Sequence, residues 1–584
     1  MRTAPNSRWS ALLCALLLLV CALATYPVAE IGITDDWSYV QSARVLAQTG
    51  HIVYNGWTSA MLGWQLFLGV LFARLFGPSF TAIRASTLLI ALITAFLTQR
   101  ILVRAGVCSR NATIGTLALV LSPIFLPLAV SFMTDVGGLF CVVLCLYSCL
   151  RALQAQTDRS VLAWLAFAAL SNAVGGTVRQ IAWLGVLVMF PCAVWLLRRR
   201  PRMLPYGAFL YVVSIVFIIG SLRWFHQQPH STPPEPLFSG IPSGHQLRLL
   251  AVQMSRLFFS GALFLLPVLA AFAAKIRLRD PRIAAPLLSG IVLWFAACVL
   301  LGFYYPDLLQ MLIAPFSSDC VSPFGLAATF EIQGIPPLVL PLGLRLVITA
   351  GVLFVLACFI IFLVNNRRTS TRPPAPLTAA ISWNQLLILL VPFTLAYLVL
   401  LLPRGILGIS FDRYLLPLLP IALILLLRLY EERVQSDLPW FSKALVLLFA
   451  FYAVAGTHDA FSKYRAWAAA VDELRAAGVP NTVIDAGFER NAMVQIETSG
   501  SIFNLLNVPS APDELGPSSF FPANCQPTWP RLTPVIVPGY ALSFDPNACG
   551  ELSRFAPVTY RDWLLARSIP VYIVNTVGPG SDHR

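Results

Sequence analysis

Apolar runs of about 20 residues recur along this chain between clusters of arginine, and this pattern constrains the fold more than any motif. The first run covers residues 9–29 and is long enough to cross a bilayer as a helix. Of all residues, 58% are hydrophobic and 11% are charged, which is more apolar than the core of a soluble protein requires. The sequence therefore predicts a polytopic α-helical membrane protein.

The formal net charge of +14 comes mostly from arginines between the apolar runs, in clusters at 198–202, 275–282 and 367–372. Basic residues beside spans mark cytoplasmic loops, so the lipid bilayer is the expected partner and nucleic acid is not. Arg2 and Arg8 place the N-terminus in the cytoplasm. The first run also fits a cleaved signal peptide, but we favour an uncleaved helix in the plasma (inner) membrane.

The apolar run 66–76 decides the topology. It has about a dozen residues, contains Arg74 and ends at Gly77-Pro78, so it is interpreted as a juxtamembrane helix and not as a span. The arginine clusters are then cytoplasmic; a crossing here would invert all of them. With the first run the total is about 13 spans, and the C-terminus is extracytoplasmic. The other expected spans are 82–101, 111–131, 136–152, 161–177, 181–197, 205–223, 250–273, 283–302, 340–364, 383–402, 412–428 and 441–457.

The chain divides into a transmembrane module, residues 1–457, and a small extracytoplasmic α/β domain, residues 458–584. In the second part we expect a helix at 460–477 and strands at 482–486, 535–537 and 570–574. Cys525 and Cys549 lie in this polar part and are expected to form a disulfide in an oxidising compartment. Most other cysteines lie inside apolar runs, and no spacing typical of a metal site occurs.

Two adjacent carboxylates, Asp35 and Asp36, follow the first apolar run at the start of the first external loop, residues 30–81. Charge beside a membrane span is costly and often functional. The sequence from Asp35 predicts an amphipathic interfacial helix that ends at Gly50. Capping of this helix is the alternative role for the two acids.

Further charged residues map to the external ends of spans. Asp135 opens the fourth span, and Arg84, Arg179 and Arg413 lie where the positive-inside rule does not call for arginine. A guanidinium at such a position can bind a phosphate group through two hydrogen bonds. The alternatives are an Asp135 satisfied by Thr134 or by a helix terminus, and arginines that snorkel or, for Arg413, pair with Asp412.

The order of these features resembles the polyprenyl-phosphate-sugar-dependent glycosyltransferases of the C-type fold, which include protein mannosyltransferases and the aminoarabinose transferase of lipid A. The resemblance covers roughly residues 1–180 and the region of Arg413. It rests on the acid pair with Tyr39, then Gly50, Leu75-Phe76-Gly77, Arg84, Asp135, and Arg413-Tyr414-Leu415-Leu416-Pro417.

The resemblance implies that Asp35, with Asp36 and Asp135, carries catalysis, and that Arg84, Arg179, Arg413 and Tyr414 bind the lipid phosphate. Asp36 departs from the usual Asp-Glu pair, and residues 60–63 replace the usual Pro-Pro. No cofactor is implied. A divalent metal is left open, although no ligand cluster supports one.

The implied reaction is inverting transfer of a sugar from a polyprenyl-phosphate donor to a lipid, glycan or protein acceptor outside the cytoplasm. A carboxylate accepts the proton of the acceptor hydroxyl, and arginines stabilise the departing phosphate. Two other functions remain open at this point. They are a transporter or flippase for a lipid-linked sugar, and a catalytically silent protein of envelope assembly.

Overall fold

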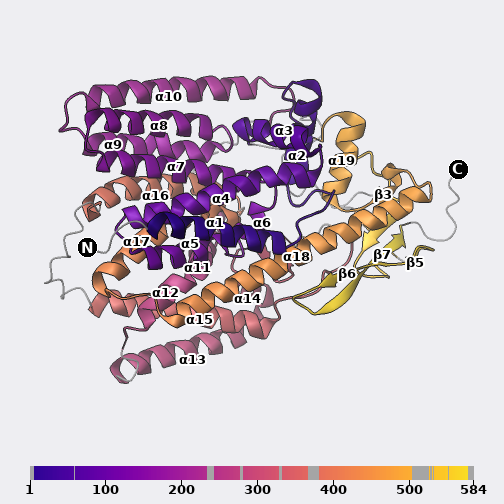
Figure 1. Cartoon of the computed structure of the whole chain (residues 1–584). Coiled ribbons are helices and arrows are strands. Elements are labelled where there is room, and N and C mark those ends of the chain that lie inside the picture. Colours follow the sequence, from indigo (N-terminus) through magenta and orange to yellow (C-terminus); the bar gives the residue numbers. More distant parts are fainter. Residues whose placement is uncertain are drawn as a thin grey trace.

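Helices that lie roughly side by side form most of the molecule, and the strands gather at one end of this bundle (Figure 1). The structure is a computed structural model. It describes residues 6–57, 60–232, 242–276, 281–317, 319–327, 332–365, 381–408, 410–502, 525, 529–530, 532–549 and 551–576. The arginines at 367–372 lie outside these ranges.

Helical residues occur in every predicted span. In chain order the helices of the bundle are α1 (Asn6–Ala24), α4 (Phe80–Arg104), α5 (Ser109–Val120), α6 (Phe125–Ala129), α7 (Thr134–Gln154), α8 (Asp158–Gly175), η1 (Gln180–Trp183), η2 (Gly185–Met189), α9 (Phe190–Leu196), α10 (Met203–His226), α11 (Gly244–Phe264), α12 (Leu266–Ala273), α13 (Pro281–Tyr304), α14 (Pro306–Leu312), α15 (Leu342–Asn365), α16 (Trp383–Ile406), η3 (Asp412–Leu415), α17 (Leu419–Arg433) and α18 (Trp440–Ala476). Within the described ranges, seven of them, α4, α7, α10, α11, α15, α16 and α18, are long and apolar enough to cross a membrane. The total of about 13 crossings stays a prediction.

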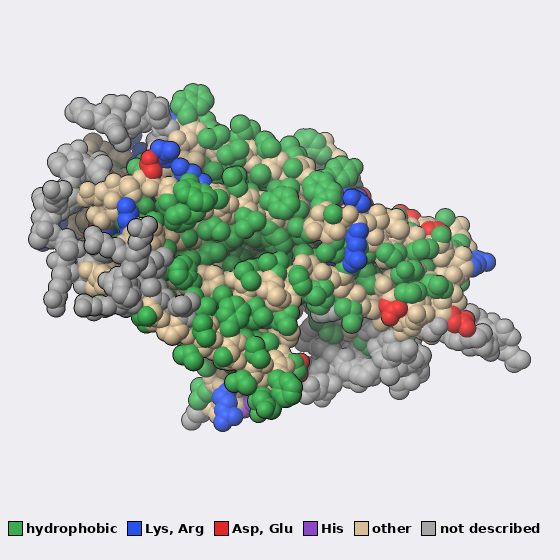
Figure 2. Space-filling view, turned by 90° about the horizontal axis from the view of Figure 1, so that it is seen from below, with side chains coloured by type: hydrophobic (Ala, Val, Ile, Leu, Met, Phe, Trp, Pro, Cys, Tyr) green, Lys and Arg blue, Asp and Glu red, His purple; other side chains and the backbone are tan. Residues whose placement is uncertain are grey.

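Large apolar side chains cover the outside of the bundle. Val216 on α10 and Val347 on α15 are 65% and 63% exposed. In each of these helices, only 28% of the apolar 18-residue stretch that could cross a membrane is buried. Figure 2 shows hydrophobic side chains over the middle of one face, with charged groups mainly towards its ends. Such a surface is stable in lipid and not in water, so the chain is a multi-pass membrane protein.

The first loop holds two helices, α2 (Asp36–Thr49) and α3 (Gly63–Phe76). As predicted, α2 stops at Gly50, whose φ of 74° suits glycine. Its Trp37 and Val40 are fully buried, so α2 packs inside the protein. At the start of α3, the Trp64 indole donates a hydrogen bond to the carbonyl of Gly175.

Both ends of α3 lie at the same end of the bundle. Near its start, the Gln65 amide donates to the carbonyl of Phe132, just before α7. Just after its end, the Arg44 side chain on α2 donates to the carbonyl of Pro78. The chain therefore enters and leaves α3 on one side, which agrees with the juxtamembrane interpretation.

The last predicted span and the helix expected at 460–477 form one continuous helix, α18. Gly456 lies within α18, and a Cβ there would crowd Leu326 of the β1–β2 hairpin (β1, Val321–Ser322; β2, Gly325–Leu326). The glycine therefore serves close packing and does not end the helix.

Beyond α18 the chain forms a small mixed sheet in the order β3-β4-β7-β5, and β6 pairs with β7. The strands are β3 (Ile484–Asp485), β4 (Tyr540–Ser543), β5 (Glu551–Leu552), β6 (Val558–Asp562) and β7 (Arg567–Asn575), and α19 (Phe488–Ser499) follows β3. β3 and β4 are parallel, and the other pairs are antiparallel.

The strand expected at 570–574 lies inside β7, whereas the one expected at 535–537 is wrong. That segment is a turn and loop with Val537 66% exposed, and Pro538 beside it has no N–H for a sheet ladder. Cys525 and Cys549 form a disulfide. One continuous hydrophobic cluster includes Leu18 in α1, Trp467 in α18 and Ile573 in β7, so the C-terminal region shares its core with the bundle.

Candidate active site

A cavity of about 690 Å³ lies where the first loop, the ends of several bundle helices and the C-terminal region meet. Its lining combines carboxylates, guanidinium groups and aromatic rings from segments far apart in sequence. The charged residues that line it are Asp35, Asp135, Arg179, Asp319, Arg404, Arg413 and Glu489. Five of the seven residues expected to act in catalysis or phosphate binding therefore face one cavity: Asp35, Asp135, Arg179, Arg413 and Tyr414.

Asp35 occupies the N-cap position of α2, but its side chain makes no capping hydrogen bond. Instead, the Trp57 indole Nε1 donates to Asp35 Oδ1 at 2.9 Å, and Arg413 Nη2 donates to Oδ2 at 3.2 Å. The Asp35 side chain is 27% exposed. The carboxylate is thus held at the cavity wall while it remains accessible.

Asp36 and Arg84 form a separate, closed ion pair. Arg84 Nε donates to Asp36 Oδ2 at 2.7 Å, and the side chains are only 2% and 0% exposed. Backbone N–H groups of Ile33 and Phe132 also donate to the carboxylate. Neither Asp36 nor Arg84 lines the cavity. Their contacts fix the loop around Asp35 against α4 and the segment before α7.

Arg413 connects two acids from distant parts of the chain. Arg413 contacts Asp35 through Nη2. Its Nε lies 3.1 Å from Oδ2 of Asp319, a residue in the loop between α14 and α15. Burial raises the pKa of Asp319 to about 6, although the adjacent Arg413 guanidinium acts to lower it. Asp319 is therefore partly protonated in mildly acidic solution.

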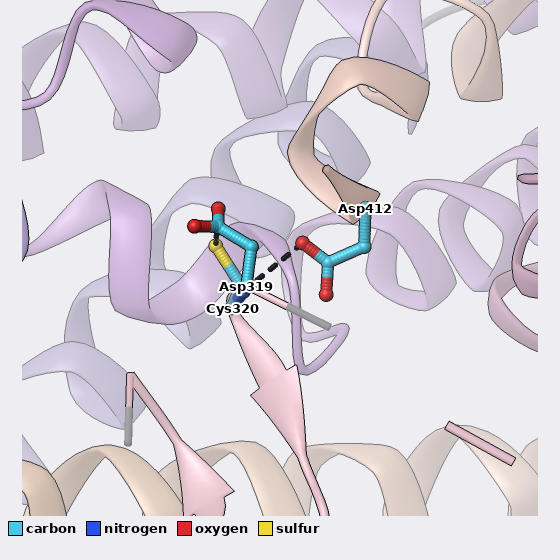
Figure 3. A group of neighbouring side chains, drawn as sticks. All are labelled: Asp319, Cys320 and Asp412. Atoms are coloured by element: carbon cyan, nitrogen blue, oxygen red, sulfur yellow. Dashed lines mark hydrogen bonds between the residues drawn. The ribbon is translucent and has the colours of Figure 1, made fainter. Parts of the chain in front are cut away.

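Asp319, Cys320 and Asp412 bring three potential metal-ligand atoms within 4.8 Å of one another (Figure 3). Asp412 accepts the backbone N–H groups of Cys320 and Val321 at 3.0 and 2.9 Å. Burial raises the pKa of the Cys320 thiol well above its usual value, whereas metals bind the thiolate. The contacts fit an anchor that holds the Asp319 loop against η3 better than a metal centre.

Asp135 and Arg179 form the second ion pair of the cavity. Asp135 is in the first turn of α7, and Arg179 immediately precedes η1. Asp135 Oδ2 is buried and has no hydrogen-bond partner among the described residues. The described residues therefore leave the hydrogen-bonding capacity of this buried oxygen unfilled.

Tyr414 links the arginines. Arg404 Nη1, near the end of α16, donates to Tyr414 Oη at 2.7 Å, and Arg179 lies over the Tyr414 ring at 5.4 Å from its centroid. Tyr397 Oη donates to the Tyr414 carbonyl at 2.7 Å, which fixes η3 on α16. This side of the cavity is rich in cationic groups.

The sequence analysis missed several lining residues. Arg404 lies at the end of an expected span where the positive-inside rule does not call for arginine, so the reasoning used for Arg179 and Arg413 would have found it. Asp319 was noticeable only as an acid in a long external loop. No pattern in the sequence marks the other missed residues, Trp57, Phe488, Glu489 and Trp529.

No protein-family model and no curated protein sequence matches the chain. Among solved structures, it is similar to ArnT from Cupriavidus metallidurans bound to undecaprenyl phosphate, with 15% identity, TM-score 0.39 and 100% of both chains covered. It is similar to the oligosaccharyltransferase AglB from Archaeoglobus fulgidus in complex with an inhibitory peptide and a dolichol-phosphate, with 16% identity, TM-score 0.41, and 93% and 70% covered.

The S. cerevisiae protein O-mannosyltransferase Pmt1–Pmt2 complex bound to the sugar donor has 13% identity and TM-score 0.32. The match covers 42% of this chain and 37% of that one, so the chain spans well under half of the mannosyltransferase it matches. The solved structures are of the glycosyltransferase group that the sequence resembles. The likeness is distant, and the function therefore has to be argued from the site.

Proposed function

We propose that this protein transfers a sugar from a polyprenyl-phosphate carrier to an acceptor outside the cytoplasm, with inversion at the anomeric carbon. The observation that carries the proposal is the shared cavity, in which Asp35, Asp135 and Asp319 lie beside Arg179, Arg404 and Arg413. Carboxylates serve as proton acceptors and guanidinium groups as phosphate ligands, so one cavity holds both chemical requirements of the reaction.

In the proposed reaction Asp35 accepts the proton of the acceptor hydroxyl. The hydroxyl oxygen forms a bond to the anomeric carbon, while the bond from that carbon to the phosphate oxygen breaks. The electron pair of the broken bond leaves with the lipid phosphate, which Arg179, Arg404 and Arg413 stabilise. The Trp57 and Arg413 contacts orient the Asp35 carboxylate.

Asp36 and Arg84 take a positioning role in this proposal. Their buried pair holds the backbone on either side of Asp35, because Arg84 also donates to the carbonyls of Ala29 and Ile31. Asp135 is proposed to accept a hydrogen bond from a substrate hydroxyl through Oδ2.

The test is Asp35→Asn in proteoliposomes supplied with radiolabelled polyprenyl-phosphate sugar and a mixed acceptor extract. We expect sugar transfer to fall by about 10²–10⁴-fold, since a general base is removed, while carrier binding is kept. Asp472→Asn is the control, because the Asp472 side chain is 72% exposed on α18 and does not line the cavity. Translocation of the intact lipid-linked sugar without transfer would overturn the proposal in favour of a flippase.

A further inference from the structure

Aromatic side chains from three segments form one wall of the cavity. Trp57 comes from the first loop, Phe488 begins α19, and Trp529 comes from the segment before β4. The Trp57 and Phe488 ring centroids are 4.9 Å apart, and those of Phe488 and Trp529 are 4.6 Å apart. We call these three residues the aromatic wall.

The aromatic wall is rigid on one side and accessible on the other. Behind it, the fully buried Trp37 lies 5.8 Å from the rings of both Trp57 and Phe488. Phe488 is only 5% exposed, whereas Trp529 is 39% exposed and still lines the cavity. A large ring that is half open to solvent beside a packed aromatic cluster offers a preformed face to a ligand.

Carboxylates border this wall. Trp57 Nε1 donates to Asp35 Oδ1, and Glu489, next to Phe488 in α19, also lines the cavity. Ring faces suit apolar C–H groups, and carboxylates accept hydrogen bonds from hydroxyls. A pyranose has both, an apolar face of axial C–H groups and a rim of hydroxyls. An acyl chain offers no hydrogen-bond donor to these carboxylates, and a phosphate would be repelled by them.

The contacts also indicate which sugar lies here. Two of the three proposed phosphate ligands, Arg404 and Arg179, contact Tyr414 and not the aromatic wall. The third, Arg413, contacts Asp35 and so lies between the two groups. The wall instead contacts Asp35, the proposed base, directly through Trp57. A ring on the wall would bring its hydroxyl to the base, which is the geometry required of an acceptor.

We propose that Trp57, Phe488 and Trp529 form the acceptor subsite and that the acceptor is a saccharide. This rests on the proposed function, since it names the acceptor class of the same cavity. It gives the C-terminal region a direct part in recognition, because two of the three rings come from it.

The test measures binding of methyl pyranosides and cellobiose to the full chain in nanodiscs by saturation-transfer NMR. Trp529→Ala is expected to raise the dissociation constant by about tenfold, which corresponds to the loss of one aromatic contact. Trp529→Phe should recover most of the affinity, because it restores a ring face. The matched control is Trp440→Ala, which removes a tryptophan that is 76% exposed at the start of α18.

Equal affinity in the Trp529→Ala and Trp440→Ala variants would overturn the proposal, and so would binding of a Ser/Thr peptide that depends on Trp529 in place of the sugars. A second arm compares undecaprenyl phosphate with its glucose-bearing form. If Trp529→Ala weakens only the glucose-bearing lipid, the wall holds the donor sugar and the acceptor assignment is wrong. Saccharide binding that depends on Trp529 without any transfer by the wild-type chain would instead reject the proposed reaction.

Discussion

Arg413 makes the contacts that bring the acids of the cavity together. It lies 3.2 Å from Asp35 and 3.1 Å from Asp319, so one guanidinium joins carboxylates that are hundreds of residues apart in sequence. A guanidinium has several donors in a fixed plane and can contact both acids at once. The orientation of Asp35 therefore depends on the protonation of Asp319.

This dependence predicts an acidic limit to activity. With the pKa of Asp319 raised to about 6, the carboxylate that pairs with Arg413 is present above pH 6 and lost below it. We expect the transfer rate of the wild-type protein to decrease when the pH is lowered below about 6. The Asp319→Asn variant should be slow at every pH between 5 and 7.5 and should not show this decrease. Rates across this range test the prediction, with the exposed Asp307→Asn as control. An unchanged pH profile in Asp319→Asn would contradict it.

The same pKa shift has a consequence for stability. Because the pKa is raised above that of an unfolded aspartate, the folded protein binds the proton more tightly. The contribution of Asp319 to the free energy of unfolding is therefore full at low pH. It decreases as the pH rises towards 6.

The buried pair of Asp36 and Arg84 gives a second prediction. Arg84→Ala leaves a fully buried carboxylate without its cation, and we expect a loss of about 3–5 kcal/mol in the free energy of unfolding. Unfolding in SDS measures the loss. Arg110→Ala breaks an exposed pair with Asp437, in which the side chains are 63% and 49% exposed. It should cost under about 1 kcal/mol, and equal losses in the two variants would refute the structural role of Asp36.

Among the elements, α3 positions the cavity because its first turn packs on the segment between α8 and η1. Gly63 begins the helix with a φ of 28°, and a Cβ at this position would overlap the side chain of Thr177. Thr177 lies two residues before Arg179, so the contact also locates that arginine. Glycine is required here both for the backbone angle and for the close approach.

Gly63→Ala is therefore expected to destabilise the protein by about 1–3 kcal/mol, as overpacking does, and to lower the transfer rate through displacement of Arg179. The apparent melting temperature and the transfer rate are the measurements. Gly343→Ala on α15 is the control, because a Cβ there has nothing within 4 Å. Wild-type activity and melting in Gly63→Ala would show that α3 does not set the site.

In the whole molecule, the first loop and the C-terminal strands lie at one end of the bundle, and the N-terminus lies towards the other (Figure 1). We propose that the end with the cavity is extracytoplasmic and that the N-terminus is cytoplasmic, as the arginine clusters predict. Cys108, an exposed cysteine at the turn between α4 and α5, is then a natural reporter of the cytoplasmic side.

A membrane-impermeant maleimide should therefore leave Cys108 unmodified in intact cells and label it after permeabilisation. In a Cys108→Ser background, the introduced cysteine of His51→Cys, at an exposed position after α2, should be labelled without permeabilisation. Labelling of both positions from the same side would overturn the orientation and the juxtamembrane interpretation of α3.

The helices could be predicted from the sequence because their signals are local. Apolar runs of membrane length, the stop at Gly50 and Pro123, which lies between α5 and α6, depend on neighbouring residues alone. The sequence also predicted that Asp35 and Asp135 lie at the same end of the bundle. That prediction needs only a count of membrane crossings and no knowledge of tertiary contacts. By contrast, the strand expected at 535–537 was wrong, because a prediction from β propensity gave too little weight to Pro538, which has no N–H for a sheet ladder.

The tertiary structure alone decided which acid pairs with which arginine. Asp36 and Arg84 neutralise each other in the interior, whereas Asp35 meets Arg413 in the cavity, although the two aspartates are adjacent in sequence. The sequence by itself determined that carboxylates and arginines would gather at one end of a membrane bundle. Their pairing, the place of Asp319 and the aromatic wall depend on contacts across hundreds of residues, which are set by packing and charge neutralisation in the folded chain and leave no periodic trace in the sequence.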